Sequence, residues 1–471
     1  MGEEITSCHF TEQDFSEYRA RLIKESALLK DWFTQSSFST RHPMGGFEVE
    51  AWLVDQHGSP VPFNESFLAL LESPLVVPEL AQFNVEINTA PLPLSGDSLR
   101  TMQANLSHTW ERCNQAAKAL NVELLMVGIL PTVREAELNL TNMSSKERYR
   151  ALNEQVFRLR HHKPIPLDIQ GRDHLQTTHT DVMLEAAATS FQVHMQVSQA
   201  ESVRFYNAAM IVSAPMIALA ANSPYLFGHD LWDETRILLF EQAVGLATEK
   251  TNRVSFGSGY LCESLLECFL ENVDSYEILL PMLMDDTAQK LSHVRLHNGT
   301  IWRWNRPLVG FDEDGTPHLR IEHRVLPAGP SLIDVIANAA FFFGLMRAMA
   351  TRSIAPESLL PFEQARSNFY AAAKDGLHSS VVWLDGKSVP VRQLLLEELL
   401  PLARLGLQNF GFSCDDIALY LGVIEGRLKT GQNGAVWQRA YVAKHGKDMQ
   451  ALTCAYRDRQ RSGDPVHEWM I

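Results

Sequence analysis

Cysteine is scarce in this chain and is not arranged for a disulfide framework or a zinc site. Only six cysteines occur among 471 residues, and none forms a C-x-x-C pair. Scattered cysteines are typical of a protein that stays reduced, so the pattern favours a cytoplasmic location. The N-terminus reads Met1-Gly2-Glu3-Glu4, which is acidic and lacks an apolar core, and we therefore expect no signal peptide.

Positive charge and long apolar runs are also scarce. The formal net charge is −15, and no basic stripe interleaved with aromatics occurs, which excludes an ordinary nucleic-acid-binding surface. The most apolar stretch, Ile211 to Ala221, is shorter than the roughly 20 residues that span a bilayer. We expect a buried helix there and no membrane partner. An acidic protein still binds ATP where metal ions and local arginines supply positive charge.

The common phosphate-binding and hydrolase motifs are absent. No G-x-x-x-x-G-K-[ST] loop occurs, because Gly386-Lys387-Ser388 lacks the upstream glycine. The segment Gly257-Ser258-Gly259 lacks the third glycine of a dinucleotide loop. Neither H-E-x-x-H nor G-x-S-x-G is present. If this protein uses ATP, it therefore uses a sheet on which carboxylates carry the metal ions.

The composition, with 45% hydrophobic and 21% charged residues, is that of a globular protein. Periodicity and turn signals predict an α+β fold in which helices flank a curved, mostly antiparallel sheet. The expected helices are 10–36, 64–73, 98–120 and 201–221, and the expected strands are 46–54, 82–88, 123–130, 189–197, 300–310 and 318–326. We place a catalytic domain over 1–350 and a helical C-terminal region, packed on it, over 351–471. The locally basic segment 144–163 is expected to form a solvated helix face.

Four short strand-like runs carry charged or amide side chains on one face and mostly apolar side chains on the other. Side chains alternate across a strand, so every second residue of a run lies on the same side. The polar sets are Glu48/Glu50, Asn84/Glu86/Asn88, Gln192/His194/Gln196 and Arg320/Glu322/Arg324. If the four runs pair in one sheet, their shared face is a bowl of carboxylates, a histidine and two arginines, which suits divalent cations and phosphates.

A solvated sheet face is the alternative explanation of this alternation. Such faces usually carry lysine, yet these four carry none, and the chain has no lysine from Asp31 through Ala117. Glu48 and Glu50 also lie side by side on one strand, which is unfavourable unless a cation bridges them. Both observations favour a metal-binding face.

The same segments resemble a known family. In order, they are Gly45–Glu50, Gln82–Leu92, Thr189–His194, Ala220–Pro224 and Arg320–Arg324. This series looks like the glutamate–cysteine ligase family, in particular its carboxylate–amine ligase branch, within the glutamine-synthetase-like superfamily. The resemblance covers about residues 40–350 and implies the glutamine-synthetase-like catalytic fold.

The resemblance implies an ATP-dependent ligase that activates the γ-carboxylate of glutamate as an acyl phosphate and joins it to an amine, with cysteine the leading acceptor. Two or three Mg²⁺ ions would neutralise the repelling triphosphate and carboxylate. The implied metal ligands are Glu48, Glu50, Glu79, Glu86 and Glu322. The implied catalytic residues are Arg320, Arg324 and His194, and the implied substrate contacts are Gln192, Asn222 and Arg236.

Several alternatives stay open at this point. His194 is also explained as a satisfied sheet histidine, Arg320 and Arg324 as a charge ladder with Glu322, and Arg236 as a surface helix residue. Another amine, a phosphagen-kinase-like phosphotransferase on the same fold and a ligase-shaped binding protein without turnover are the competing functions. The expected partners are small molecules, namely glutamate, an amine and ATP, and the resemblance leaves a homo-oligomer open.

Overall fold

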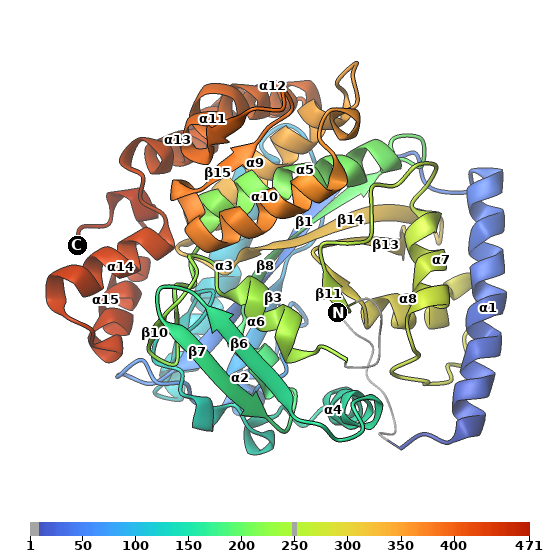
Figure 1. Cartoon of the computed structure of the whole chain (residues 1–471), viewed down its shortest axis with the longest axis horizontal. Helices are drawn as coiled ribbons and strands as arrows, with labels where there is room; N and C mark the ends of the chain where they lie inside the picture. The colour runs from blue at the N-terminus through green and yellow to red at the C-terminus, as the bar shows by residue number, and fades with distance from the viewer. Residues whose placement is uncertain (1–8, 247–251) are drawn as a thin grey trace.

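An eight-stranded sheet forms the centre of the molecule in a computed structural model, which describes residues 9–246 and 252–471 (Figure 1). The expected acidic N-terminus and Cys8 lie outside these residues. The strand order is β13-β14-β8-β1-β3-β2, and β4 and β5 also pair with β1. The bounds are β1 (Met44–Val54), β2 (Val76–Pro78), β3 (Asn84–Asn88), β4 (Leu92–Pro93), β5 (Glu123–Leu125), β8 (Ser190–Val197), β13 (Asn305–Phe311) and β14 (Pro317–Pro327).

The four alternating runs are neighbours in this sheet, as predicted. They occupy β3, β1, β8 and β14, and each adjacent pair is antiparallel. Phe47, Val49, Val193 and Ile321 point to the buried apolar side and are no more than 2% exposed. Because side chains alternate along each strand, the polar residues of all four runs lie together on the opposite side.

Two long apolar helices belong to the core that covers the apolar side of the sheet. These are α5 (Ser202–Ala220) and α9 (Leu332–Ala350), which Figure 1 shows lying near the strands. Both are long and apolar enough to cross a membrane, but 89% and 83% of their most apolar windows are buried inside the protein. Burial of this extent explains their composition as that of core helices, and it confirms the buried helix expected at Ile211 to Ala221.

The other helices of the N-terminal three quarters surround the sheet. They are α1 (Glu12–Gln35), α2 (Asn64–Leu71), α3 (Ser98–Ala119), α4 (Glu147–Leu159), α6 (Arg236–Ala243), α7 (Leu266–Ser275) and α8 (Ser292–Gly299). Local sequence sets some of their ends. Thr11 and Asp14 form a reciprocal capping box at the start of α1, which satisfies two backbone amides that have no partner within the helix. The helices predicted at 10–36, 64–73, 98–120 and 201–221 are all present.

The C-terminal region is mainly helical but not entirely so. It contains α10 (Phe362–Asp375), α11 (Val391–Leu394), α12 (Leu400–Phe410), α13 (Cys414–Thr430), α14 (Gly434–His445) and α15 (Met449–Ser462). Strands β15 (Ser380–Val382) and β16 (Ser388–Pro390) form a hairpin here that the helical prediction missed. Its turn carries Asp385-Gly386, with Gly386 at φ +75°, which is an ordinary hairpin signal. Helices α12 and α13 share one core cluster with α9, and the boundary near residue 350 stays a prediction.

Two predicted strands are shorter than expected. The strand predicted at 300–310 is interrupted at Trp304, because β12 (Trp302–Arg303) pairs in parallel with β11 (Val254–Ser255) whereas β13 pairs with β14. The Trp304 amide still donates to Ser255, and its carbonyl already accepts from the Arg324 amide. The strand predicted at 123–130 ends at Leu125, because the carbonyls of Val127 and Gly128 accept from Thr189 instead of from a strand partner.

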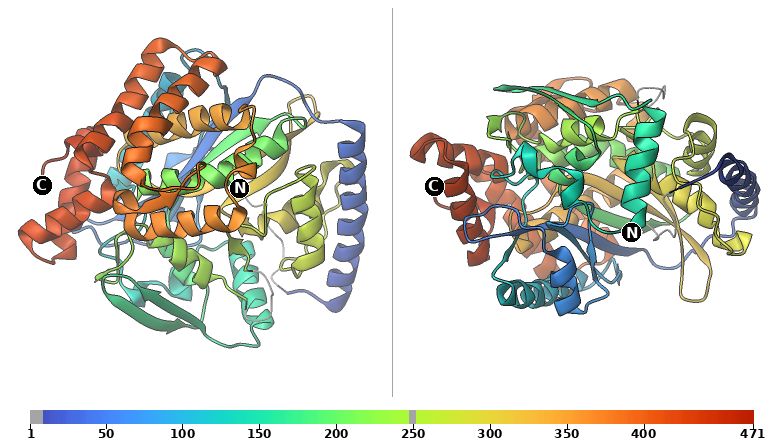
Figure 2. Two further views of the ribbon diagram at one scale, coloured as in Figure 1. Left: turned by 45° about the horizontal axis from the view of Figure 1, so that its top comes forward. Right: turned by 90° about the horizontal axis from the view of Figure 1, so that it is seen from below.

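A second hairpin was also missed by the sequence analysis. Strands β6 (Ile165–Gln170) and β7 (His174–His179) form an antiparallel ribbon whose Ile165, Leu167 and Ile169 are buried while the residues between them are exposed. The period-two signal was therefore present in the sequence. In both views of Figure 2 this ribbon and α1 lie at the periphery of the molecule, on different sides.

Candidate active site

Two clusters of potential metal ligands lie on the polar face of the sheet. The His194 cluster consists of Glu48, His194 and Glu322, and the Glu86 cluster consists of Glu50, Glu79 and Glu86. Within each cluster, one ligand atom per residue lies within 4.8 Å of the other two. The structure therefore brings together all five predicted metal ligands and His194, in two groups of three.

Strand register brings these residues together. Glu322 of β14 lies directly opposite His194 of β8, and Glu50 of β1 lies directly opposite Glu86 of β3. His194 Nε2 is 3.2 Å from Glu48 Oε1 and 3.9 Å from Glu322 Oε1. Because Glu48 and Glu50 are two residues apart on the same strand, one cluster follows directly on the other along β1.

The carboxylate of Glu322 in the His194 cluster is paired with arginine. Arg306 binds it through both oxygens, with Nε to Oε2 at 2.6 Å and Nη2 to Oε1 at 3.0 Å. Arg324 Nη1 lies 3.3 Å from Oε2. Burial alone would favour the neutral acid, but Arg306 and Arg324 hold the pKa of Glu322 well below its usual range. This carboxylate is charged with no cation bound.

The Glu86 cluster has no such compensation. In the described residues no ion pair joins Glu50, Glu79 or Glu86 to a basic side chain. Burial and the charge of Glu86 raise the pKa of Glu50 to about 7, and burial and Glu50 raise the pKa of Glu79 to about 7. Burial, Glu48 and Glu79 raise the pKa of Glu86 well above its usual range. Three buried carboxylates at this separation are unfavourable unless they take up protons or a cation.

Residues of strand β8 orient the carboxylate of Glu50. Glu50 Oε2 accepts from the Ser190 amide at 2.6 Å, and Glu50 Oε1 accepts from the Ser190 hydroxyl at 2.8 Å and from Gln192 Nε2 at 3.2 Å. Donors on both oxygens fix the orientation of the carboxylate before any ligand arrives. Gln192, a predicted substrate contact, therefore lies in the bowl but already bonds to a cluster residue.

The donor atoms of both clusters fit divalent cations. Mg²⁺ prefers oxygen ligands, and the Glu86 cluster supplies only carboxylates. The His194 cluster adds an imidazole to two carboxylates; its Nε2 faces Glu48, and its Nδ1 has no hydrogen-bond partner among the described residues. A largely shielded imidazole with one nitrogen toward a carboxylate and the other without a partner is uncommon in a satisfied sheet histidine and is consistent with a ligand.

Two arginines on β14 complete the bowl with sites for an anion. In the described part of the chain no hydrogen bond or ion pair engages the side chain of Arg320, and its buried Nε has no partner. Arg324 contacts Glu322 and donates to Gln192 Oε1, yet its Nε is also buried without a partner. Guanidinium donors without partners beside two carboxylate clusters suit the oxygens of a phosphate. Only Arg324, not Arg320, forms the charge ladder considered from the sequence.

Asn222 and Arg236, the other predicted substrate contacts, are occupied inside the fold. Asn222 lies just after α5, and its amide nitrogen donates to Ala328 and to the Tyr456 hydroxyl, each at 2.8 Å. Gln438 donates to its oxygen at 3.0 Å. Arg236 is 2% exposed, rather than on a helix surface, and binds Glu234 and the backbone of β14. Both side chains hold parts of the fold together.

Three charged residues near the bowl were missed by the sequence analysis. Arg306 was detectable, because the predicted Asp-Gly turn sets a register in which it faces Glu322. Glu185, in the short helix Met183–Ala187, has its pKa raised to about 7 by burial and by Glu50, but no local pattern marks it. Arg148 lies on α4, where its charge acts on Glu79 and Glu185.

The basic segment 144–163 is consequently more than a solvated helix face, and that expectation is wrong in part. Arg148 donates to the Tyr149 hydroxyl at 2.6 Å and is only partly exposed. Arg160 is 6% exposed and donates to the carbonyls of Lys163 and Pro164. Both guanidinium groups lie partly inside the protein, where Arg160 meets carbonyls beyond α4 and Arg148 meets the neighbouring Tyr149 hydroxyl and the charges of Glu79 and Glu185.

Comparisons with known proteins identify the family and the fold of the chain. Residues 44–455 match the sequence model of glutamate-cysteine ligase family 2. A structure of glutamate–cysteine ligase from Francisella tularensis in complex with AMP superposes with a TM-score of 0.55 at 11% identity, over 90% of this chain and 90% of that chain. A bifunctional glutathione synthetase from Pasteurella multocida gives a TM-score of 0.50 at 12% identity, over 93% of this chain and 54% of that chain. These likenesses confirm the predicted fold class. No curated protein sequence matches the chain.

Proposed function

The chain belongs to glutamate-cysteine ligase family 2, and on that premise we propose that it is an ATP- and Mg²⁺-dependent ligase that joins the γ-carboxylate of glutamate to an amine. Cysteine is the leading acceptor. The observation that carries this proposal is the pair of adjacent carboxylate clusters with two arginines beside them on one sheet face.

The reaction has two balanced steps. A γ-carboxylate oxygen of glutamate attacks the γ-phosphorus of ATP, a new O–P bond forms, and ADP leaves. The amine then attacks the carbonyl carbon of the resulting acyl phosphate, a C–N bond forms, and phosphate leaves with the amine giving up a proton. The products are ADP, phosphate and a γ-glutamyl amide.

The charges of this chain fit the first step. The His194 cluster and the Glu86 cluster would each hold Mg²⁺, which when bound neutralises the repulsion between triphosphate and carboxylate. Arg320 has its guanidinium donors free for oxygens of the transferred phosphoryl group. Arg324 lies between the clusters and adds a fixed positive charge. Gln192 orients Glu50 for its role as a metal ligand.

The cellular location of the protein, its partners and the cooperation of its two domains are proposals as well. Scattered cysteines, of which Cys262 and Cys414 are exposed and free, are compatible with a reducing cytoplasm. Small molecules are the proposed partners, and a homo-oligomer is compatible with the fold. The two predicted domains would act together, because one hydrophobic core extends across residue 350.

Phosphate release from ATP, measured with glutamate and a panel of amines, tests the proposal. We expect release that depends on glutamate, an amine and Mg²⁺, is fastest with cysteine, and yields a γ-glutamyl amide by mass spectrometry. Glu48→Gln and Glu322→Gln should abolish it with the fold retained. Faster release with another amine would correct the acceptor. A phosphorylated amine product would indicate a phosphotransferase, and ATP binding without turnover would indicate a binding protein.

A further inference from the structure

Strand β14 contains an irregularity next to the bowl. Its pairing with β8 is regular up to His323 and resumes at Leu326 with a shifted register. Arg324 and Val325 lie in the shifted segment, so their carbonyls are outside that hydrogen-bond ladder. An unpaired carbonyl in the interior is costly, and a bulge of this kind persists only where other groups satisfy it.

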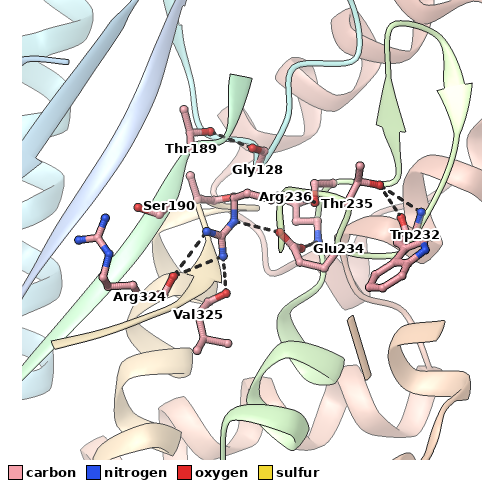
Figure 3. A network of polar contacts seen from close by, with 12 residues as sticks. Gly128, Thr189, Ser190, Trp232, Glu234, Thr235, Arg236, Arg324 and Val325 are labelled. Carbon is pink, nitrogen blue, oxygen red and sulfur yellow. Dashed lines mark hydrogen bonds and ion pairs between the residues drawn. The ribbon is translucent and has the colours of Figure 1, made fainter. Parts of the chain in front are cut away.

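Arg236 satisfies these two carbonyls. Its Nη1 and Nη2 each lie 3.5 Å from the Arg324 oxygen, and Nη2 donates to the Val325 oxygen (Figure 3). The guanidinium is fixed from its other edge, where Nε donates to Glu234 Oε1 at 3.1 Å, and it lies 5.4 Å over the ring of Trp304. The planar fork of an arginine reaches both carbonyls at once, which a lysine ammonium does not.

The bulge sets the direction of the Arg324 side chain. Figure 3 shows this side chain directed away from Arg236. In the bowl, Arg324 Nη1 lies 3.3 Å from Glu322 of the His194 cluster and also donates to Gln192. Gln192 Nε2 in turn donates to Glu50 of the Glu86 cluster at 3.2 Å. One guanidinium is therefore linked to both clusters, directly to one and through a single amide to the other.

We propose that Arg236 is a positioning residue: it holds the β14 bulge so that Arg324 is a fixed positive charge shared by the two clusters, and this charge weakens their binding of divalent cations. The inference rests on the proposed function, because it assumes that the clusters are cation sites. A triphosphate bound beside Arg324 would compensate its charge, so that cations bind tightly only together with the nucleotide.

A purely structural role for Arg236 gives the opposite expectation for cation binding. If Arg236 only stabilised the fold, its loss would loosen the clusters and weaken both cation binding and turnover. If it positions Arg324, its loss frees that guanidinium to move away from the clusters. Cation binding in the absence of nucleotide then becomes tighter while turnover falls.

Calorimetric titration of the full chain with Mn²⁺ alone, in the absence of nucleotide, separates the two roles. Arg236→Lys keeps the buried charge but loses the fork, and we expect it to tighten Mn²⁺ binding by about threefold to tenfold. Arg324→Gln removes the shared charge and should tighten binding by about tenfold or more. The double variant should bind no more tightly than Arg324→Gln, because Arg236 acts only through Arg324. Turnover should fall in all three.

Arg439→Lys is the matched control. The side chain of Arg439 on α14 is only 9% exposed and also binds a carboxylate and a carbonyl, with Nε to Asp230 at 2.7 Å and Nη2 to the Leu231 oxygen at 2.9 Å. It makes no contact with either cluster in the described residues. We expect this variant to melt at a lower temperature with unchanged Mn²⁺ affinity.

Weaker or unchanged Mn²⁺ binding in Arg236→Lys, or additive effects in the double variant, would overturn the inference while the proposed function stands. If wild-type protein binds no Mn²⁺ and releases no phosphate from ATP, both fail. Should Arg236→Lys not fold, Glu234→Gln tests the same link, because it keeps the hydrogen-bond acceptor for Arg236 and removes its charge. We then expect Glu234→Gln to bind Mn²⁺ slightly more tightly than the wild type. Unchanged or weaker binding in this variant would also overturn the inference.

Discussion

The two carboxylate clusters lie on one sheet face and contain similar residues, yet their charges are balanced in different ways. In the His194 cluster, Arg306 and Arg324 contact Glu322, so that this carboxylate stays charged without a cation. In the Glu86 cluster, burial and like charges raise the pKa of Glu50 and Glu79 to about 7. In the His194 cluster one carboxylate is thus balanced by arginine before any cation binds, whereas the carboxylates of the Glu86 cluster are balanced only by protons or a cation.

The largest expected effect comes from removing Arg306, the arginine that pairs with Glu322 in the His194 cluster. Arg306→Met leaves Glu322, which is 2% exposed, without its bidentate partner. We expect the free energy of unfolding, measured by denaturant titration without metal, to fall by about 3–5 kcal/mol. The double variant Arg306→Met/Glu322→Met should be close to wild type, because the whole pair is replaced by apolar groups. An equal loss of unfolding free energy in the single and the double variant would show that the unpaired charge of Glu322 is not the cause of the destabilisation.

Glu86→Gln addresses the uncompensated cluster. Removing one of three like charges should leave the metal-free protein as stable as wild type or more stable, because repulsion is relieved. ATP turnover should fall about 100-fold or more, equivalent to about 2.7 kcal/mol or more of transition-state stabilisation. Thermal melting and phosphate release are the measurements, with Glu65→Gln, on the exposed first turn of α2, as control. A strongly destabilised Glu86→Gln would contradict the contrast between the clusters.

The contrast also predicts a pH dependence of stability. Between pH 4.5 and 7 the unfolded chain has lost the protons of Glu50 and Glu79, whose pKa values of about 7 keep them protonated in the folded protein. Because the folded state then binds more protons, these groups make stability fall as pH rises through this window.

Melting temperatures without metal at pH 5 and pH 8 test this, with the double variant Glu50→Gln/Glu79→Gln as reference. The wild type should lose more stability than the reference on going to pH 8. Mg²⁺ should restore to the wild type the stability that it loses at pH 8. It should have little effect at pH 5, where protons occupy the carboxylates. Equal Mg²⁺ stabilisation at both pH values would refute the prediction.

The smallest effect is expected at Glu185, which lies outside both clusters but acts on Glu50. Glu185→Gln removes one more negative charge from the uncompensated side, which should weaken Mn²⁺ binding by about 1 kcal/mol, or roughly fivefold. Glu135→Gln is the control, because it changes an exposed acid away from the bowl. Gln192→Glu is not suitable as a control, because it changes a hydrogen bond to Glu50. If Glu185→Gln lowers Mn²⁺ affinity as much as Glu86→Gln does in the same titration, Glu185 belongs to the Glu86 cluster.

The sequence predicted the residues of the bowl better than their roles. Period-two alternation in four runs was enough to bring Glu48, Glu86, His194 and Glu322 to one face, because a strand has only two faces. Asn222 carried the same kind of polar signal but is bonded to Tyr456, 234 residues further along the chain. No local pattern identifies a partner at that distance, so a substrate contact and an internal anchor look alike in sequence.

What the sequence by itself determined is the composition of each strand face, and with it the meeting of carboxylates, an imidazole and arginines on one side of a sheet. What only the tertiary structure decided is which of those charges are paired. Arg306 reaches Glu322 because β13 and β14 form a hairpin, and Arg236 reaches the carbonyls of Arg324 and Val325 because α6 begins beside a bulge. Alternation is a property of one strand, whereas the pairing of charges depends on elements that only the folded chain brings together.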